Sequence, residues 1–282
     1  MFLENIKEAI TSIFSNKMRS VLTMLGIIIG ISAVITITTI GNSIQTTLTS
    51  TLNSLGGNTV QAYVDARYPE DEADMATWKY PDMKASDYVT QEMIDELMEK
   101  YPDEFDGLAA SESLGSGQIR QDKDTYANVS VQGTTSEYID YMKLKMYAGR
   151  NLTKQDNNTK KNVCVVADTM AKQYFGDENP IGEQITYAGS DGKIYNFTIV
   201  GIYEYNAALF GKVDTSVPEK DRSTTMFIPI KTCFKLMGKD QSGYTEFNLM
   251  VNSLADINQA TTDVKNFFEE KYAKNKNTRT GT

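Results

Sequence analysis

The run VLTMLGIIIGISAVITITTI, residues 21–40, decides how the rest of this 282-residue chain is interpreted. It contains no charged residue, and the uncharged region around it extends from Ser20 to Val64. Twenty residues at about 1.5 Å per residue form a helix about 30 Å long, which is the thickness of the hydrocarbon layer of a bilayer. A helix pairs its own backbone groups, and threonine hydroxyls bond back to the preceding turn. The sequence therefore predicts a membrane-spanning helix.

A cleaved signal peptide is the competing interpretation of the same run. The apolar core of a signal peptide is about 7–15 residues long, and a small-x-small cleavage site follows it. The run here is longer, a 20-residue leader precedes it, and no such site is evident after it. The length and the charge pattern favour the membrane anchor.

The charges on either side of the run predict its orientation. Lys17 and Arg19 lie directly before it, and basic residues at the end of a span stay on the cytoplasmic side. Residues 65–106, on the other side, contain 14 acidic and 4 basic residues. We therefore expect a cell-membrane protein whose N-terminus is cytoplasmic and whose main domain is extracellular or periplasmic.

Residues 1–20 have a pattern of their own. Apolar residues such as Phe2, Ile6, Ile10 and Ile13 recur at helical spacing with polar residues between them. This predicts an amphipathic helix on the cytoplasmic side of the membrane. The helix lies in the inner interface of the bilayer or packs on a partner protein, and the sequence leaves both open.

The helix is expected to continue beyond the membrane as a stalk. Ile44, Leu48, Leu52 and Leu55 continue an apolar stripe through polar, uncharged residues, and two glycines at 56–57 provide a helix stop. The membrane helix and the stalk together are predicted over 21–57, and the stalk projects about 20 Å beyond the bilayer. A stripe of this kind needs a neighbouring helix to cover it, from the same complex or from a second copy of the chain.

A weaker packing signal lies inside the membrane run. Gly26 and Gly30 form a G-x-x-x-G pattern, which allows two membrane helices to approach closely. The same spacing also arises from local composition alone. We predict these two glycines, with the stalk stripe, as helix-packing positions.

Composition limits the function of the remainder. Apolar residues make up 40 % and charged residues 23 %, with a mean hydropathy of −0.38, as expected for one span attached to a folded domain. A net charge of −9 repels phosphate backbones, so no nucleic-acid partner is expected. The absence of histidine removes Ser-His-Asp catalysis and histidine-containing zinc sites, and two cysteines are too few for a Cys₄ site. No G-x-x-x-x-G-K-[ST] motif occurs, so we expect no ATP binding, catalytic residue, cofactor or metal in this chain.

The region after residue 57 predicts a mixed α and β domain, giving an α+β fold class with an N-terminal transmembrane and stalk helix. Periodicity and turn residues indicate the elements, and the basic C-terminal tail is expected to fray. The strands are expected at 59–64, 107–113, 117–121, 125–132, 161–167, 183–188, 193–203, 224–230 and 246–251, and the helices at 90–101, 168–176, 232–237 and 255–272.

At this point the residues resemble a known family. The stretch MRSVLTMLGIIIGI, residues 18–31, is similar to the first transmembrane segment of MacB-type ABC transporter permeases, in the MacB/FtsX family. Later matches keep the family's order and extend the resemblance over nearly the whole chain. They are Gly57-Asn58-Thr59, Val131-Gln132-Gly133 with Glu137-Tyr138, Gly149-Arg150 with Val163–Ala167, Gly182–Ile185, Ile199–Ile202 and Phe227–Ile230.

The resemblance implies the architecture of the outer region. In this family it is the MacB-like periplasmic core domain, a mixed α/β subdomain called the porter with a smaller β-rich subdomain inserted in it. On this chain the porter-like part is expected at 58–140 plus 224–282, and the insertion at 141–223.

The resemblance also implies partners and a mechanism. The family's permeases dimerise and bind two ATPase domains, and closure at the cytoplasmic side is transmitted along stalk helices to the outer domain. The expected partners are an ABC ATPase subunit, a second permease copy, a membrane-fusion or adaptor protein and the lipid bilayer. The expected function is the membrane subunit of an exporter of a drug, peptide or other amphiphile, with ATP hydrolysis located outside this chain.

The chain departs from the family in having one apolar run where the family has four spans. We interpret it as truncated before the second span. An FtsX-like membrane regulator of a cell-wall hydrolase remains the alternative function. An extracellular enzyme on a signal anchor, such as a Glu/Asp glycosidase, is disfavoured by the lack of histidine and of any nucleophile motif.

Overall fold

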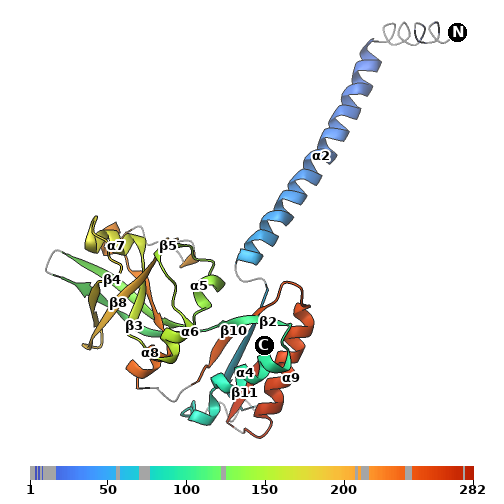
Figure 1. The fold of residues 1–282 in the computed structure, drawn as a ribbon. Helices are drawn as coiled ribbons and strands as arrows, with labels where there is room; N and C mark the ends of the chain where they lie inside the picture. The colour runs from blue at the N-terminus through green and yellow to red at the C-terminus, as the bar shows by residue number, and fades with distance from the viewer. Residues whose placement is uncertain are drawn as a thin grey trace. The chain divides into compact units, whose positions relative to one another are not determined.

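The structure is a computed structural model that describes residues 17–54, 58–69, 77–121, 125–206, 209–210, 216–238, 243–275 and 277–282, with Glu4, Ile6 and Glu8. The side chains at 17, 19–20, 41–54 and 219 lie outside the description. The chain divides into two units, Met1–Leu55 and Gly56–Thr282. Figure 1 shows the elements of both, and each unit is described by itself.

The first unit contains one long helix, α2, over Lys17–Ser54 (38 residues). It includes the whole predicted membrane run, and its backbone continues through Ile44, Leu48 and Leu52. Thr36 and Thr38 donate side-chain hydrogen bonds to carbonyls one turn back, at 2.8 and 2.9 Å, so their hydroxyls are satisfied within the helix. The predicted amphipathic helix at 1–20 lies mostly outside the described residues, as do Leu55 and the two glycines at 56–57.

The second unit contains a four-stranded antiparallel sheet in the order β11-β1-β10-β2. Helices α4 and α9 contribute to its core together with alternate residues of the strands (Figure 1). Thr90 begins α4 by accepting a hydrogen bond from the Met93 amide, as its position before an apolar run predicts. The bounds are β1 Thr59–Ala66, β2 Phe105–Ala109, β10 Glu246–Val251, β11 Thr278–Gly281, α4 Gln91–Lys100, α9 Ile257–Tyr272 and the short helix η1 Ala85–Asp87.

The C-terminal tail corrects one prediction, because it forms strand β11 instead of fraying. Asp65 of β1 pairs with Arg279, and Tyr63 pairs with Gly281. The Arg279 guanidinium lies 3.5 Å from the Asp65 carboxylate and 4.8 Å from the ring centroid of Tyr68. The short polar segment of β11 lacks the alternation of apolar and polar residues that predicts a strand. It forms a strand because it pairs with the edge of β1.

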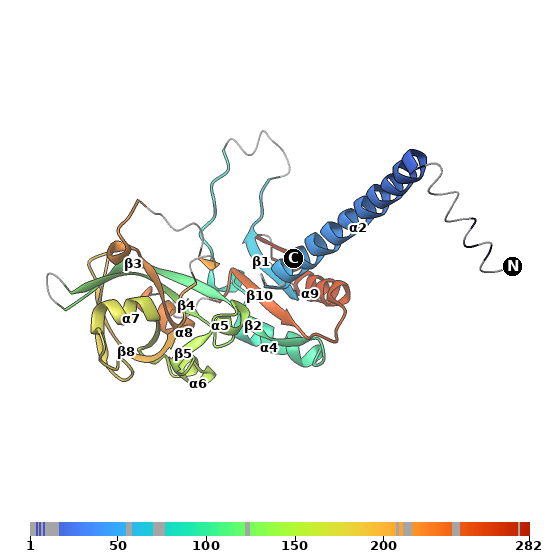
Figure 2. The ribbon, with the colours of Figure 1, turned by 90° about the horizontal axis from the view of Figure 1, so that it is seen from above.

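The second sheet closes into a six-stranded barrel. Its order is β5-β8-β6-β9-β4-β3-β7, and an additional β7–β8 pairing closes the ring, with β5 attached to β8. Figure 2 shows these strands curving around a common interior. The strands are β3 Ser111–Arg120, β4 Tyr126–Thr134, β5 Met146–Gly149, β6 Val163–Ala167, β7 Gln184–Gly189, β8 Ile194–Tyr203 and β9 Thr224–Pro229.

Buried and partly exposed side chains alternate along the strands, and the buried ones fill the interior of the barrel. Along β4, Ala127, Val129 and Val131 are buried while their neighbours are partly exposed. Across the interior, the rings of Tyr203 and Phe227 lie 5.3 Å apart, and the Tyr203 hydroxyl donates to the Thr225 carbonyl at 2.8 Å. Each large side chain buried in this way contributes about 1.5–3 kcal/mol to the stability of the fold. Because these side chains fill the interior, the barrel is a packed core and not a pore.

The pairing of the strands groups the chain differently from the expected subdomain ranges. Strands β3, β4 and β9 lie within 58–140 and 224–282, yet they hydrogen-bond into the barrel with the strands of 141–223. The reason is the parallel pairing of β4 with β9, which brings both strands into one sheet. The division into a porter-like part at 58–140 plus 224–282 and an insertion at 141–223 stays a prediction about subdomains. The two sheets define two cores. The strands of the first core lie within 59–109 and 246–281, and those of the second lie within 111–229.

Short helices complete the barrel side. In helix α7, Ala167 is the N-cap and Asp168 is the first helical residue, which corrects the prediction that Asp168 is the cap. Its carboxylate still accepts from the Thr169 amide at 2.7 Å and from the Tyr205 amide at 3.0 Å, so it connects the start of α7 to the end of β8. The bounds are α5 Tyr138–Tyr141, α6 Lys154–Asn158, α7 Asp168–Phe175, α8 Ile230–Leu236 and η3 Glu219–Asp221.

Helix α8 joins the two cores. Ile230 at its start packs into the core of the four-stranded sheet, and Cys233 one turn later packs into the barrel core. A Cβ at Gly133 of β4 would lie 2.2 Å from the Cβ of Cys233, so only glycine allows α8 to lie this close to the strand.

Thr135 fixes the same junction by hydrogen bonds. Its hydroxyl donates to the Leu108 carbonyl at 2.7 Å and accepts from the Ala110 amide at 3.1 Å, and its own amide donates to the Ala110 carbonyl. The side chain is buried, so water does not replace these bonds. The segment between β2 and β3 is therefore held against the residues that follow β4.

Helix α6 is held by a buried carboxylate. Asp156 is 1 % exposed and accepts from Arg150 Nη1 at 2.6 Å and from the hydroxyl and amide of Thr153 at 2.7 and 3.0 Å. Burial by itself raises the pKa of Asp156, but the bonds from Arg150 and Thr153 and the Arg150 charge outweigh it, and the pKa is lowered to about 2. The ionised carboxylate therefore stabilises the fold.

We expect Thr135→Val to destabilise the protein by about 1–3 kcal/mol, because it keeps the shape but leaves the buried Leu108 carbonyl and Ala110 amide without the hydroxyl. Denaturant unfolding of the full chain in detergent measures the change. Thr186→Val is the matched control, since Thr186 is exposed and its hydroxyl bonds only a side chain, and it should cost less than about 0.5 kcal/mol. Equal losses for the two variants would contradict this role of Thr135.

We expect Asp156→Asn to lower the free energy of unfolding by about 2 kcal/mol at pH 7, since the pKa of the carboxylate is lowered by nearly two units on folding. A carboxylate whose pKa is lowered by folding stabilises the fold at pH values above its pKa in the unfolded chain, which is about 4. This stabilisation is lost as the pH falls toward the folded-state pKa of about 2. The difference between wild type and variant should therefore shrink between pH 4 and pH 2 in denaturant unfolding. A difference that stays constant over this pH range for Asp156→Asn would refute the prediction.

Candidate functional site

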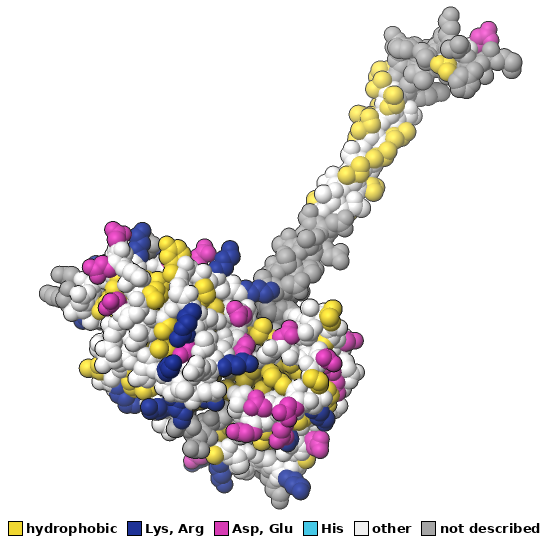
Figure 3. Space-filling model, viewed as in Figure 1, with side chains coloured by type: hydrophobic (Ala, Val, Ile, Leu, Met, Phe, Trp, Pro, Cys, Tyr) yellow, Lys and Arg dark blue, Asp and Glu magenta, His cyan; other side chains and the backbone are white. Residues whose placement is uncertain are grey.

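The apolar part of α2 is the most exposed hydrophobic surface in the described residues. Val21–Ile40 has a mean hydropathy of 2.4, and none of it is buried. Figure 3 shows hydrophobic side chains along the described part of this helix and no acidic or basic ones. The helix is long and apolar enough to cross a membrane by length and composition. A helix that is apolar all round is stable only in lipid or against other apolar helices.

Of the predicted packing positions in α2, the structure describes the surroundings of Gly26 and Gly30. A Cβ built at Gly26 or Gly30 meets nothing within 4 Å. Ile44, Leu48 and Leu52 lie in the helix, but their side chains are outside the description, and Leu55 is outside it altogether. All six stay predicted helix-packing positions.

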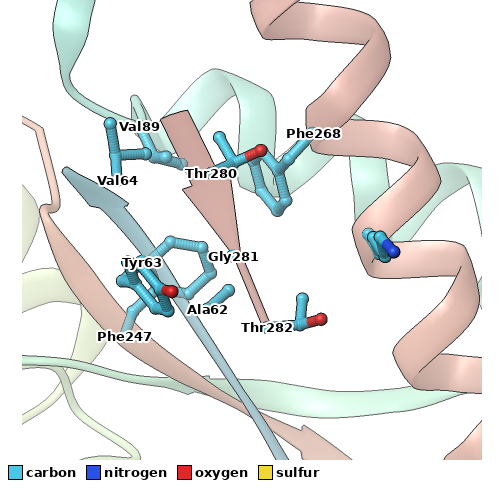
Figure 4. A pocket seen from close by; sticks show the side chains of 10 residues that line it. Ala62, Tyr63, Val64, Val89, Phe247, Phe268, Thr280, Gly281 and Thr282 are labelled. Carbon is cyan, nitrogen blue, oxygen red and sulfur yellow. The ribbon is translucent and has the colours of Figure 1, made fainter. Parts of the chain in front are cut away.

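The second unit contains two hollows of different size. The smaller, shown in Figure 4, lies among residues of β1, β10, β11 and α9, including Tyr63, Phe247 and Phe268. Its volume is about 30 Å³. A single water needs about 10–15 Å³ on the same measure, so this hollow has room for about two waters and not for a ligand.

The larger hollow is a cleft of about 230 Å³ between the two cores. One wall comes from the four-stranded sheet side and the other from the barrel side, with the residues after β4 between them. The first wall contains Gln91, Asp95, Met98, Asp106, Gly107, Leu108, Ile230 and Tyr244; the second contains Lys154, Asn157, Asn158 and Lys231; Thr135, Ser136 and Glu137 lie between them.

The two walls of the cleft differ in charge. Asp95 and Asp106 are the charged residues of the sheet-side wall, and Lys154 and Lys231 are those of the barrel-side wall. Figure 3 shows acidic side chains gathered over the part of this face that contains α4. Glu137 neutralises Lys154 at 3.2 Å. Lys231 Nζ donates to Asn158 Oδ1 at 3.1 Å, and its charge also acts on Glu92 of α4.

Asn157 is the polar side chain that the fold leaves incomplete in this cleft. It is 7 % exposed, and its amide nitrogen donates to the Thr134 carbonyl at 3.4 Å. Its oxygen Oδ1 is buried and has no hydrogen-bond partner. A buried acceptor without a donor costs about 1–3 kcal/mol.

The reactive side chains of the second unit lie away from the cleft. Cys164 and Cys233 are buried and form no disulfide bond, and burial raises the pKa of the Cys164 thiol. Among the residues that the structure describes, no three His, Cys, Asp or Glu side chains lie together in a way that would hold a metal ion.

The sequence alone does not predict which residues line the cleft. Its residues come from six separate segments between Gln91 and Tyr244, and no motif joins them. The one available signal was the pattern Thr153-x-x-Asp156, a capping box that forms α6 and precedes Asn157 and Asn158 directly. That pattern predicts a helix start and says nothing of what the helix faces.

Comparison with known proteins identifies the family. Residues 20–267 match the MacB-like periplasmic core domain. The chain is 30 % identical over 258 residues to the ABC transporter permease YknZ of Bacillus subtilis (strain 168), covering 92 % of this chain and 58 % of that protein. It is 30 % identical over 213 residues to the macrolide export ATP-binding/permease protein MacB of Vibrio parahaemolyticus serotype O3:K6, covering 76 % of this chain and 30 % of that protein. The chain thus spans between about a third and three fifths of these relatives.

Solved structures share the fold. The periplasmic region of MacB from Actinobacillus actinomycetemcomitans aligns with a TM-score of 0.56 at 14 % identity, over 82 % of this chain and 91 % of that one. The extracellular domain of the noncanonic ABC-type transporter YknZ from Gram-positive bacteria aligns with a TM-score of 0.53 at 18 % identity, over 80 % of this chain and all of that one. The resemblance inferred from the sequence is thereby confirmed, as is the fold class of an apolar helix followed by a mixed α/β domain. The chain belongs to the MacB-like periplasmic core domain family and is a distant homologue of the MacB and YknZ ABC transporter permeases.

Proposed function

We propose that this chain is the first membrane span and the extracytoplasmic domain of the permease subunit of an ABC exporter. The observation that supports it most is α2, whose 20-residue apolar run has a mean hydropathy of 2.4 and no buried residue. The membership of the following domain in a family of transporter permeases supports the same assignment. The exported molecule is a drug, peptide or other amphiphile.

The proposed orientation rests on charge. Lys17 and Arg19 stand at the start of the apolar run, and residues 20–64 contain no charge that opposes them. By the positive-inside rule the N-terminus is cytoplasmic and the domain from Gly56 onward is extracellular or periplasmic. Its acidic balance between residues 65 and 106 suits the outer side.

The proposed mechanism is mechanical. An ABC ATPase partner hydrolyses ATP on the cytoplasmic side, and α2 transmits its closure to the outer domain. The helix continues past the apolar run to Ser54, which supports a continuous rod. Gly26 and Gly30, together with the stripe of Ile44, Leu48, Leu52 and Leu55, provide the face that packs on a second permease copy or another helix of the complex. A membrane-fusion or adaptor protein is the proposed outer partner.

We expect a cysteine at Leu254 to react with a membrane-impermeant maleimide in intact cells, because Leu254 is 95 % exposed on the outer domain. The native thiols Cys164 and Cys233 are buried, so the wild type should stay unlabelled and serve as the background. Mass shift on a denaturing gel measures the labelling.

The matched control places a cysteine in the leader. Ser15→Cys should react only after the membrane is permeabilised. The opposite result, with Ser15→Cys labelled outside and Leu254→Cys protected, would overturn the proposed orientation.

We expect Ile44→Pro to uncouple the outer domain from ATP hydrolysis in the assembled transporter, because proline removes a helix hydrogen bond and costs about 3 kcal/mol or more. Spin labels at Leu254→Cys in the two permease copies report the outer-domain distance with and without ATP. The wild type should show an ATP-dependent change, and Ile44→Pro should lose it while ATPase activity remains.

Ile44→Ala is the control for loss of the side chain alone, and it should keep most of the ATP-dependent change. An unchanged response in Ile44→Pro would show that α2 does not transmit the motion.

A further inference from the structure

We infer that Asn58 is the positioning residue that passes a pull on α2 into the ends of strands β10 and β2. The inference rests on the proposed function, which supplies the pull, and it names the residue of the second unit that receives it. Its basis is the set of hydrogen bonds that join Asn58 to the end of β10, 193 and 194 positions later in the chain.

Asn58 lies where the chain enters the four-stranded sheet. Helix α2 ends at Ser54, and strand β1 begins at Thr59, directly after Asn58. Because the two elements belong to one continuous chain, a pull on α2 acts on the backbone of Asn58 before it acts on any strand. The contacts of Asn58 therefore decide how the pull is shared.

Asn58 binds the last residue of β10 with both its backbone and its side chain. The Asn58 carbonyl accepts a hydrogen bond from the Val251 amide at 2.8 Å. Its Nδ2 donates to the Val251 carbonyl at 2.6 Å and to the Asn252 carbonyl at 3.2 Å. The first pair of the β1–β10 register is Thr59 with Met250, so these bonds lie one position outside it, at the N-terminal end of β1.

Asn252 extends these bonds to two further elements. Its amide donates to the Glu104 carbonyl at 2.7 Å, and its Nδ2 donates to Asp106 Oδ1 at 2.8 Å, which connects it to the start of β2. Its carbonyl accepts from the Ala255 amide at 3.0 Å and its Oδ1 from the Leu254 amide at 3.0 Å, in the turn that leads into α9. Two asparagines therefore link the ends of β1, β10 and β2 and the start of α9.

A pull on the first residue of an antiparallel pair loads the outermost hydrogen bonds of the ladder first. At this end of β1 the outermost bonds are those of Asn58, so the two Nδ2 bonds share the load with the backbone bond. The Asn58 side chain is exposed, so these two bonds contribute little to the free energy of unfolding in the absence of load. Their contribution is to the resistance of β1 to a pull from α2.

The experiment holds the full chain in detergent micelles between two DNA handles and measures how long the β1–β10 pairing lasts at constant force. One handle is attached at Thr47→Cys in α2, and the other at Ile194→Cys, where the native side chain is 68 % exposed. The native thiols Cys164 and Cys233 are buried, so the handles react at the introduced cysteines.

We expect Asn58→Ala and Asn58→Asp to shorten the lifetime of the pairing at least fivefold, because both remove the two Nδ2 donor bonds. Asn58→Asp does so at nearly constant side-chain size. Asn266→Asp, on an exposed position of α9, introduces the same charge away from the end of β1 and should behave as the wild type does.

A second pair of attachment points separates transmission of the pull from a general effect on the fold. Handles at Lys274→Cys, an exposed position after α9, and at Ile194→Cys load the second unit without loading α2. In this arrangement the Asn58 variants should stay within twofold of the wild type. A residue that only stabilises the fold would shorten the lifetime equally in both arrangements.

An unchanged lifetime of the Asn58 variants under a pull through α2, or an equal loss in both arrangements, would overturn the inference. Unfolding curves in denaturant show whether each variant is folded. If neither Asn58 variant folds, Asn252→Ala removes the side-chain bond to Asp106, and an unchanged lifetime of that variant under the pull through α2 would overturn the inference instead.

The pulling experiment needs no ATPase, so its failure and the failure of the proposed function are distinguishable. A wild-type transporter without an ATP-dependent distance change at Leu254→Cys would contradict the proposed function. A wild type that shows this change, with a lifetime under load that does not depend on Asn58, would contradict only the role of Asn58.

Discussion

A helix with 20 consecutive uncharged residues and no buried side chain among them imposes the main constraint on this protein. Each large apolar side chain left in water forfeits about 1.5–3 kcal/mol relative to its burial, and α2 leaves all of its apolar run uncovered within the described chain. The helix therefore needs lipid or other helices around it. The proposed force transmission through α2 depends on such surroundings.

The second unit, Gly56–Thr282, meets a different constraint, since its strands must leave few open edges. The barrel removes its edges by pairing β7 with β8, and the four-stranded sheet covers β1 with the short strand β11. Helix α8 and Thr135 connect the two cores, with α8 lying against Gly133 and the threonine bonded to the segment between β2 and β3. These contacts create the cleft, because two cores held at one junction leave a hollow beside it.

The relation to transporter permeases concerns the activity of a whole transporter, whereas the cleft belongs to the second unit of this chain. The family membership covers residues 20–267, whereas the chain spans 58 % of YknZ, so the activity of the whole transporter remains a proposal for this protein. The cleft is a property of the outer domain itself.

The sequence alone determined those features that local pattern encodes. The apolar run predicted α2, and periodicity with turn residues predicted a helix at 90–101 and strands at 183–188 and 193–203, because each depends on neighbours a few residues away. Only the tertiary structure decided that the tail forms β11, that the parallel β4–β9 pair joins the barrel, and that Asn157 and Asp95 line the same cleft. These features join segments up to about 200 residues apart, and no local periodicity records a contact at that separation.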